Sequence, residues 1–414
     1  MDEIGRRYQA LALRIGRHVP EYVDFWIGSP ELREAIAGEE PAPLVELHVE
    51  AVALHEACAS LTADDPASAR RRTWLLAQLG AMSGLIRRLD GEEIAFADLV
   101  EVLFDVSVAE TPDAEVKRAH DQLDELLPPG GALRDRLAAH DAAVRVPPDR
   151  LVPVVEHLAR VLRDRTRGDL GLPDEETLEV VAVQDKGWGA AAWFLGNGQT
   201  RIELNIDFPV TLGASVYLAA HETYPGHHAE RATKEVALWR ERDLGEAALV
   251  SLFTPETTIS EALADVARGV VLTDQELGAT LRDLVRELDL LISAADVERE
   301  ALVAGARDLL RDLTCDAALA LHQIGLPEPD VRQSLAERAL RTDARVEHDM
   351  RGLHDPLWAA YAFTYAAGRR LIAPWLEVQG QSAGFARLLG EQLSPGQLRS
   401  EIGEPLPLFP GSLA

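Results

Sequence analysis

One short segment of the chain combines a His-Glu pair with two further histidines, a composition typical of catalytic metal sites. It reads Ala219-Ala-His221-Glu222-Thr-Tyr-Pro225-Gly226-His227-His228-Ala-Glu230. In zinc hydrolases with a His-Glu-x-x-His helix, two imidazoles one turn apart hold the ion and the Glu acts as general base on the attacking water. Here Pro225 occupies the position of the second histidine, so the His-Glu-x-x-His motif itself is absent. The segment still predicts a Zn²⁺ site with His221 as a ligand and Glu222 as the base, rather than a polar helix end with solvated histidines.

The Pro225-Gly226 pair decides which histidine can share an ion with His221. On a regular helix a residue six positions later lies about 240° around the axis, and one seven positions later lies about 10 Å along it, so neither could reach the ion. Proline removes a helical N–H donor and glycine tolerates unusual dihedrals, so the helix must bulge or break. That interruption, expected within residues 223–227, favours His227 as the second ligand, with His228 as the alternative. We expect Gly226 to adopt dihedrals that a Cβ would oppose.

A third ligand is needed, because a catalytic zinc site has three protein ligands and one position open to water. The best candidate is Glu261 in Ser260-Glu261-Ala-Leu-Ala-Asp265. Glu261 and Asp265 are four residues apart and share a helix face, so one can bind the metal while the other accepts the free ring N–H of a ligand histidine. This spacing is similar to that of gluzincin-type metallopeptidases. The competing interpretation is a pair of solvated helix carboxylates.

The segment from His221 to His228 resembles the motif of an uncharacterised bacterial zincin-like family, which carries His-Glu-x-x-Pro-Gly-His-His and then a Glu-Gly-Trp-Ala-Leu-Tyr-like segment. The resemblance covers most of residues 180–375. Ala262 replaces the family's Gly and the Trp is missing, whereas Tyr365-Ala-Ala-Gly368 is like its C-terminal Tyr-x-x-Gly helix. The resemblance implies a mostly helical zincin-like fold and metallopeptidase activity, with substrates generally unassigned.

Several downstream residues are candidates for handling the substrate. Related zincins place a His/Tyr pair on the oxyanion, so Tyr365 is a candidate catalytic residue and His354 a weaker substrate-binding one. Arg369 is a second substrate-binding candidate, because a guanidinium binds a carboxylate through two hydrogen bonds. For each of these residues the competing interpretation is packing or a solvated surface.

The apolar spacing predicts a mainly α protein with one small sheet beside the active-site helix. Residues 1 to about 165 have helical periodicity, and so do residues 210–389. Between them, residues 178–183, 188–194 and 201–206 have strand character, with Gly196-Asn-Gly198 as a hairpin turn. Strand 201–206 could be an edge that pairs with an extended peptide, and the competing interpretation is an ordinary strand of the sheet. The predicted regions are a helical one at 1–170 and a catalytic one at 171–414, which could also form one continuous domain.

Composition excludes several other classes of protein. The 414 residues include 41 Lys+Arg and 69 Asp+Glu, a net charge of −28, which argues against nucleic-acid binding. No apolar run is long enough to span a membrane, and no signal peptide is visible at the start. Two cysteines cannot form a disulfide framework, which fits a cytoplasmic location. The oligomeric state is left open.

Together these features predict a zinc-dependent metallopeptidase acting on short peptides. One rival is a non-catalytic helical binding protein with a structural or degenerate metal site, and another is a zinc hydrolase of non-peptide amides or esters. The coordination distinguishes the first rival, because a structural site is closed by four protein ligands and a catalytic site has three.

Overall fold

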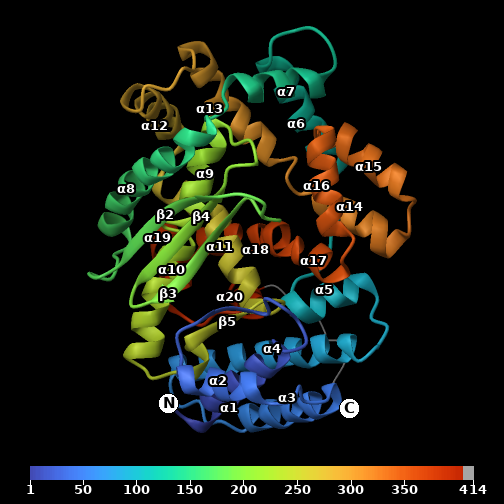
Figure 1. Cartoon of the computed structure of the whole chain (residues 1–414), viewed down its shortest axis with the longest axis vertical. Helices are drawn as coiled ribbons and strands as arrows, with labels where there is room; N and C mark the ends of the chain where they lie inside the picture. Colours follow the sequence, from blue (N-terminus) through green and yellow to red (C-terminus); the bar gives the residue numbers. More distant parts are fainter. Residues whose placement is uncertain (404–414) are drawn as a thin grey trace.

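The computed structural model describes residues 1–403 and is mainly helical, with two small sheets (Figure 1). This confirms the predicted fold class, including a sheet of three strands next to the helix that carries His221. The sequence did not predict the second sheet, which has two strands. None of the described helices is both long enough and apolar enough to cross a lipid bilayer.

The helices follow one another along most of the chain. In the first part they are α1 (Glu3–Ile15), α2 (Pro30–Gly38), α3 (Leu44–Ala59), α4 (Pro66–Leu89), α5 (Phe96–Phe104), α6 (Asp113–Leu126), α7 (Leu133–Ala143), α8 (Leu151–Asp169), α9 (Leu212–Glu222) and α10 (His227–Lys234). Then come α11 (Pro255–Val271), α12 (Asp274–Glu287), α13 (Ala294–Asp308), α14 (Leu313–Leu319), α15 (Glu328–Glu337), α16 (Asp343–Leu353), α17 (Pro356–Tyr361), α18 (Phe363–Gln379), α19 (Gln381–Gly390) and α20 (Pro395–Glu401).

The three-stranded sheet has the order β2-β4-β3, so its last strand in the chain is central. Strand β4 (Gln199–Asn205) pairs in parallel with β2 (Thr177–Val183) and antiparallel with β3 (Ala190–Gly196). The turn joining β3 and β4 has positive φ at Asn197 and Gly198, which matches the twist of a two-residue hairpin. The expectation that residues 201–206 form an edge is therefore wrong, because β2 covers that side of β4. The edge strand beside the helix of His221 is β3.

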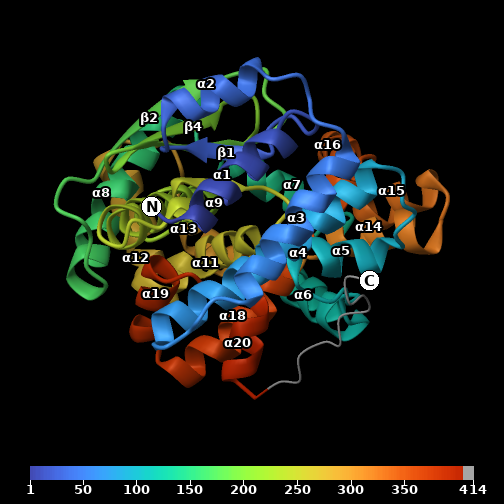
Figure 2. The same ribbon diagram turned by 90° about the horizontal axis from the view of Figure 1, so that it is seen from below.

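The two-stranded sheet joins segments that are far apart in the sequence. Strand β1 (Val23–Trp26) pairs antiparallel with β5 (Leu249–Ser251). Seen from below, β1 and α2 lie alongside the three-stranded sheet, and β1 contacts β3 (Figure 2). This arrangement brings the N-terminal region next to the segment with the predicted metal ligands.

Two hydrophobic clusters make up the core, and each draws on distant parts of the chain. The first combines α1 and α3–α6 with α13–α18, and the second combines α8 and the three-stranded sheet with α9, α11, α12 and α18–α20. Helix α11 packs against both α9 and α18. A Cβ on Gly368 of α18 would lie 2.6 Å from the Cβ of Ala262, so glycine is required for this close contact beside Glu261. The division at residue 170 stays a prediction.

Candidate metal centre

The helix that carries His221 and Glu222 is interrupted at the predicted place. Helix α9 begins after Thr211, whose hydroxyl accepts the Ala214 N–H, and it ends at Glu222. Helix α10 begins at His227, and the peptide bond between Tyr224 and Pro225 is cis. The interruption within residues 223–227 is therefore confirmed.

Gly226 lets the chain turn back against the end of α9. Its N–H donates to the carbonyl of Ala220 at 3.0 Å. A Cβ at this position would lie 1.9 Å from the carbonyl oxygen of His221, which no side chain can tolerate. Its φ is −76°, so the requirement for glycine comes from this close approach and not from a left-handed backbone conformation as in many turns.

The interruption brings His221 and His227 together with Glu261. The two Nε2 atoms are 3.2 Å apart, and Oε2 of Glu261 lies 3.4 Å from His221 Nε2 and 3.6 Å from His227 Nε2. Ligand atoms about 2.1 Å from a tetrahedral zinc ion are separated by about 3.4 Å, so this spacing fits such an ion. Within residues 1–403 these three residues form the one candidate metal-ligand group.

The carboxylate of Glu261 gives a separate test of whether a metal fits. Its Oε1 accepts a hydrogen bond from Tyr361 at 2.7 Å, whereas its Oε2 is buried and has no hydrogen-bond partner within the described residues. An unsatisfied buried carboxylate oxygen is costly unless a cation binds it. Because this orphaned oxygen is the one that faces both histidines, the donor set fits a divalent metal.

His228, the alternative ligand, points away from this group. Its Nδ1 is 2.7 Å from the hydroxyl of Thr200 on β4, and its Nε2 is 3.1 Å from Glu176. Tyr224 donates to the same carboxylate, and Arg163 bonds its other oxygen at 2.6 Å. Both ring nitrogens of His228 thus have protein partners, one of them Thr200 on β4. The geometry therefore favours His227 as the metal ligand.

Asp265 lies behind His221, as the helical spacing suggested. Its Oδ1 is 3.5 Å from Nδ1 of His221, and Tyr217 donates to this oxygen and lies 3.1 Å from the same ring nitrogen. Arg311 bonds both Asp265 and Tyr217 at 2.8 Å. Burial by itself would lower the pKa of His221. The carboxylates of Asp265 and Glu261 stabilise the protonated ring more strongly than burial destabilises it, and they raise this pKa to about 9. Zinc would therefore displace a proton from this ring when it binds at neutral pH.

Arg369 does not reach the substrate side of the site. Its guanidinium pairs with Asp265 and with Asp312, and it does not line the cavity at the metal group. The prediction that it binds substrate does not agree with this placement, because both carboxylates hold it behind the ligands. His354 is also displaced: it is exposed, lies 3.3 Å from Glu328, and is not among the cavity-lining residues.

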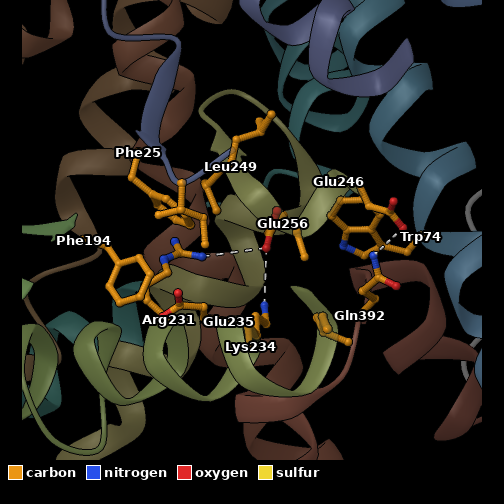
Figure 3. A pocket seen from close by; sticks show the side chains of 14 residues that line it. Phe25, Trp74, Phe194, Arg231, Lys234, Glu235, Glu246, Leu249, Glu256 and Gln392 are labelled. Atoms are coloured by element: carbon orange, nitrogen blue, oxygen red, sulfur yellow. Dashed lines mark hydrogen bonds and ion pairs between the residues drawn. The ribbon is translucent and has the colours of Figure 1, made fainter. Parts of the chain in front are cut away.

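His227 rests on a buried charged cluster made of Glu230, Arg231, Lys234 and Glu256. Ser260 lies 3.2 Å from Nδ1 of His227 and donates to Glu230 at 2.6 Å. Lys234 bonds Glu230 at 2.8 Å, and both cations of the cluster face Glu256 (Figure 3). Burial opposes ionisation of Glu230, but the two cations outweigh it and hold its pKa well below the usual range.

Glu222 and Tyr365 line the cavity at the metal group. Within residues 1–403 no donor bonds the carboxylate of Glu222, and burial raises its pKa despite the nearby His221 and His227. The ring of Tyr365 is centred 6.2 Å from that of His221. Both residues line a cavity of about 530 Å³, together with all three candidate ligands. Its other walls come from β1, β3, α17, α2 and β5 and from the loops next to them.

Sequence reasoning missed three residues that support this site: Tyr217, Glu230 and Ser260. All three are close in sequence to a ligand, since Tyr217 precedes His221 by one helical turn, Glu230 follows His227 by three residues and Ser260 adjoins Glu261. Helical spacing could have identified the first two as neighbours of a ligand. Tyr361 lies in the same downstream segment as Tyr365, and tertiary packing brings its hydroxyl to Glu261.

No known family model matches the chain, and no curated protein matches it in sequence. Its fold is similar to that of a proposed lipoprotein from Colwellia psychrerythraea, with a TM-score of 0.52 and 14% identity over 86% of this chain and 66% of that chain. It is also similar to a proposed lipoprotein of unknown function from Shewanella oneidensis, with a TM-score of 0.50 and 13% identity over 90% and 76% of the two chains.

An M32 carboxypeptidase from Deinococcus radiodurans R1 has a TM-score of 0.44 and 15% identity, over 98% of this chain and 95% of that chain. The first two similarities show a shared helical fold, and this chain spans just under two thirds of the Colwellia protein. At these identities they carry no information on activity. The zincin-like family resemblance therefore continues to rest on the motif, and the cytoplasmic location stays a prediction.

Proposed function

We propose that this protein is a zinc-dependent hydrolase that cleaves peptide bonds in short peptides. The observation that carries the proposal is the convergence of His221, His227 and Glu261 on one point, with Glu222 beside them, at the wall of a large cavity. Three ligands with an open side are typical of a catalytic zinc site, whereas a structural site is closed by a fourth. Within residues 1–403 no fourth ligand joins the group, which argues against a purely structural metal.

The chain's own residues supply the proton transfers that the reaction needs. A zinc ion bound here would polarise the substrate carbonyl and acidify the attacking water. Glu222, which no protein donor occupies, would accept the proton of that water at its carboxylate and deliver it to the leaving amine nitrogen. The hydroxyl of Tyr365 would donate a hydrogen bond to the developing oxyanion.

The shape of the cavity favours a short, extended substrate. About 530 Å³ is within the range of small-molecule sites and too small for a folded protein. Residues Ala190, Ala191 and Ala192 of the edge strand β3 line it, so an extended peptide could pair with that strand next to the metal. This takes over the role that strand 201–206 was expected to have.

The activity can be tested by removing and restoring the metal. Chelated protein should cleave none of a pool of dipeptides to hexapeptides, and addition of one equivalent of zinc should restore cleavage, followed by mass spectrometry. Glu261→Gln, treated in the same way, should bind well below one zinc per chain and stay inactive. A zinc-loaded wild type that leaves every peptide intact would overturn the proposal. Turnover of non-peptide amides or esters alone would instead favour that substrate class.

A further inference from the structure

A carboxylate from the N-terminal region lines the same cavity as the residues of the metal group. Asp24 belongs to β1, where Val23 pairs with Ser251 and Phe25 pairs with Val250, the adjacent residue of β5. Asp24 is therefore the extra residue of a β-bulge and has no cross-strand partner. Bulges redirect a side chain and are common beside active sites. Here the bulge places Asp24 on the cavity wall together with Glu222 and His227.

Asp24 has no partner within residues 1–403. No hydrogen-bond donor and no ion-pairing cation contacts its carboxylate, and the residue is half-buried in the cavity wall. Burial raises its pKa, and the field of Arg231 only partly opposes this. Arg231 itself is turned to Ser260, at 3.0 Å, and to the buried charged cluster. A half-buried carboxylate without a protein partner can accept a charge-assisted hydrogen bond from a cationic group that enters the cavity.

The aromatic side chains of the cavity also suit a cation. The face of an aromatic ring attracts a positive group, and five aromatic side chains line the cavity: Trp188, Trp193, Trp358, Tyr361 and Tyr365. Two other carboxylates of the lining have no protein donor among the described residues. Glu222 has the proton-transfer role, and Glu21 is exposed to solvent, whereas Asp24 is half-buried. Arg33, the second arginine of the lining, is exposed on α2.

We propose that Asp24 receives a protonated amine of the substrate, so that the preferred substrates are short peptides with a free ammonium group near the bond that is cleaved. The inference rests on the proposed function, because it names the substrate class of the same cavity. The ammonium could be the α-amino group of the peptide or the amine of a lysine-type side chain. Both would make the charge-assisted hydrogen bond that Asp24 lacks.

The test compares matched peptides on zinc-loaded wild type and Asp24→Asn. One pair differs by acetylation of the N-terminus, and a second pair replaces lysine by norleucine. The wild type should prefer the member with the relevant amine, and Asp24→Asn should lose about 10- to 100-fold in kcat/KM on it, mainly through KM. Turnover of the uncharged member should stay the same, and so should zinc content and Tm. Glu34→Gln, an exposed carboxylate on α2 outside the cavity lining, is the matched control and should change none of these values.

The outcomes separate this inference from the proposed function. Equal preference for charged and uncharged peptides in both proteins would overturn the role of Asp24 and leave the hydrolase proposal intact. If the wild type cleaves nothing, calorimetric titration with the uncleaved peptides decides. Binding of the amine-bearing peptide that weakens in Asp24→Asn would keep the inference while the hydrolase proposal fails. Absence of any amine-dependent binding would overturn both.

Discussion

Glu222→Gln should keep its zinc and lose about 10²–10⁴-fold in kcat/KM on any peptide that the wild type cleaves. Glutamine has the size of glutamate but cannot take up a proton, so the change removes the base without emptying the space. The zinc should stay because the three converging ligand atoms come from His221, His227 and Glu261. Glu222 also makes no hydrogen bond within the described residues whose loss would unfold the site.

The measurement pairs metal analysis with steady-state kinetics on the same preparation. A drop of this size corresponds to about 2.7–5.5 kcal/mol of transition-state stabilisation. Zinc loss along with the carboxylate would mean that Glu222 is a ligand. Wild-type turnover with full zinc would mean that another group is the base, and the assignment of Glu222 would then be wrong.

Gly226→Ala should damage both stability and metal binding. The new Cβ would lie 1.9 Å from the carbonyl oxygen of His221, a backbone atom that cannot move without moving the ligand itself. We expect a loss of about 2–3 kcal/mol in the free energy of unfolding, of the order seen for overpacked positions, and at least a tenfold weaker zinc affinity. Denaturant unfolding and a competitive zinc titration measure the two effects.

Gly269→Ala is the matched control for that variant. Gly269 lies on α11, the helix of Glu261, and a Cβ there would meet nothing within 4 Å. Since alanine favours a helix over glycine, this change should stabilise the protein by up to about 1 kcal/mol and leave zinc affinity unchanged. If Gly226→Ala behaves like this control, the close approach at Gly226 is not what holds the two histidines together.

The local part of the site could be predicted from the sequence because it depends on helix geometry. A proline four residues after His221 cannot continue the helix, so an interruption had to lie between the histidines, and the structure has it there. The four-residue spacing of Glu261 and Asp265 likewise put both carboxylates on one face of α11.

The remaining parts depend on tertiary packing, which spacing does not encode. From its chemistry alone, Arg369 could bind either a substrate carboxylate or a buried carboxylate of the protein. The packing of α18 against α11 decides between them, because it brings Arg369 to Asp265. The parallel pairing of β2 with β4 puts β4 in the centre of the sheet, so that β3 is the edge strand that lines the cavity. Asp24 gave no signal at all, because its strand pairs with β5, a segment far along the chain.

The most direct test of the metal centre is the position of the ion in a crystal of the zinc-loaded protein. An anomalous difference map at the zinc edge should show one strong peak within about 2.0–2.2 Å of His221 Nε2, His227 Nε2 and Glu261 Oε2, with its remaining position facing the cavity that contains Glu222. A peak on His228 or Glu176, a site closed by a fourth protein ligand, or no peak among these residues would contradict the account.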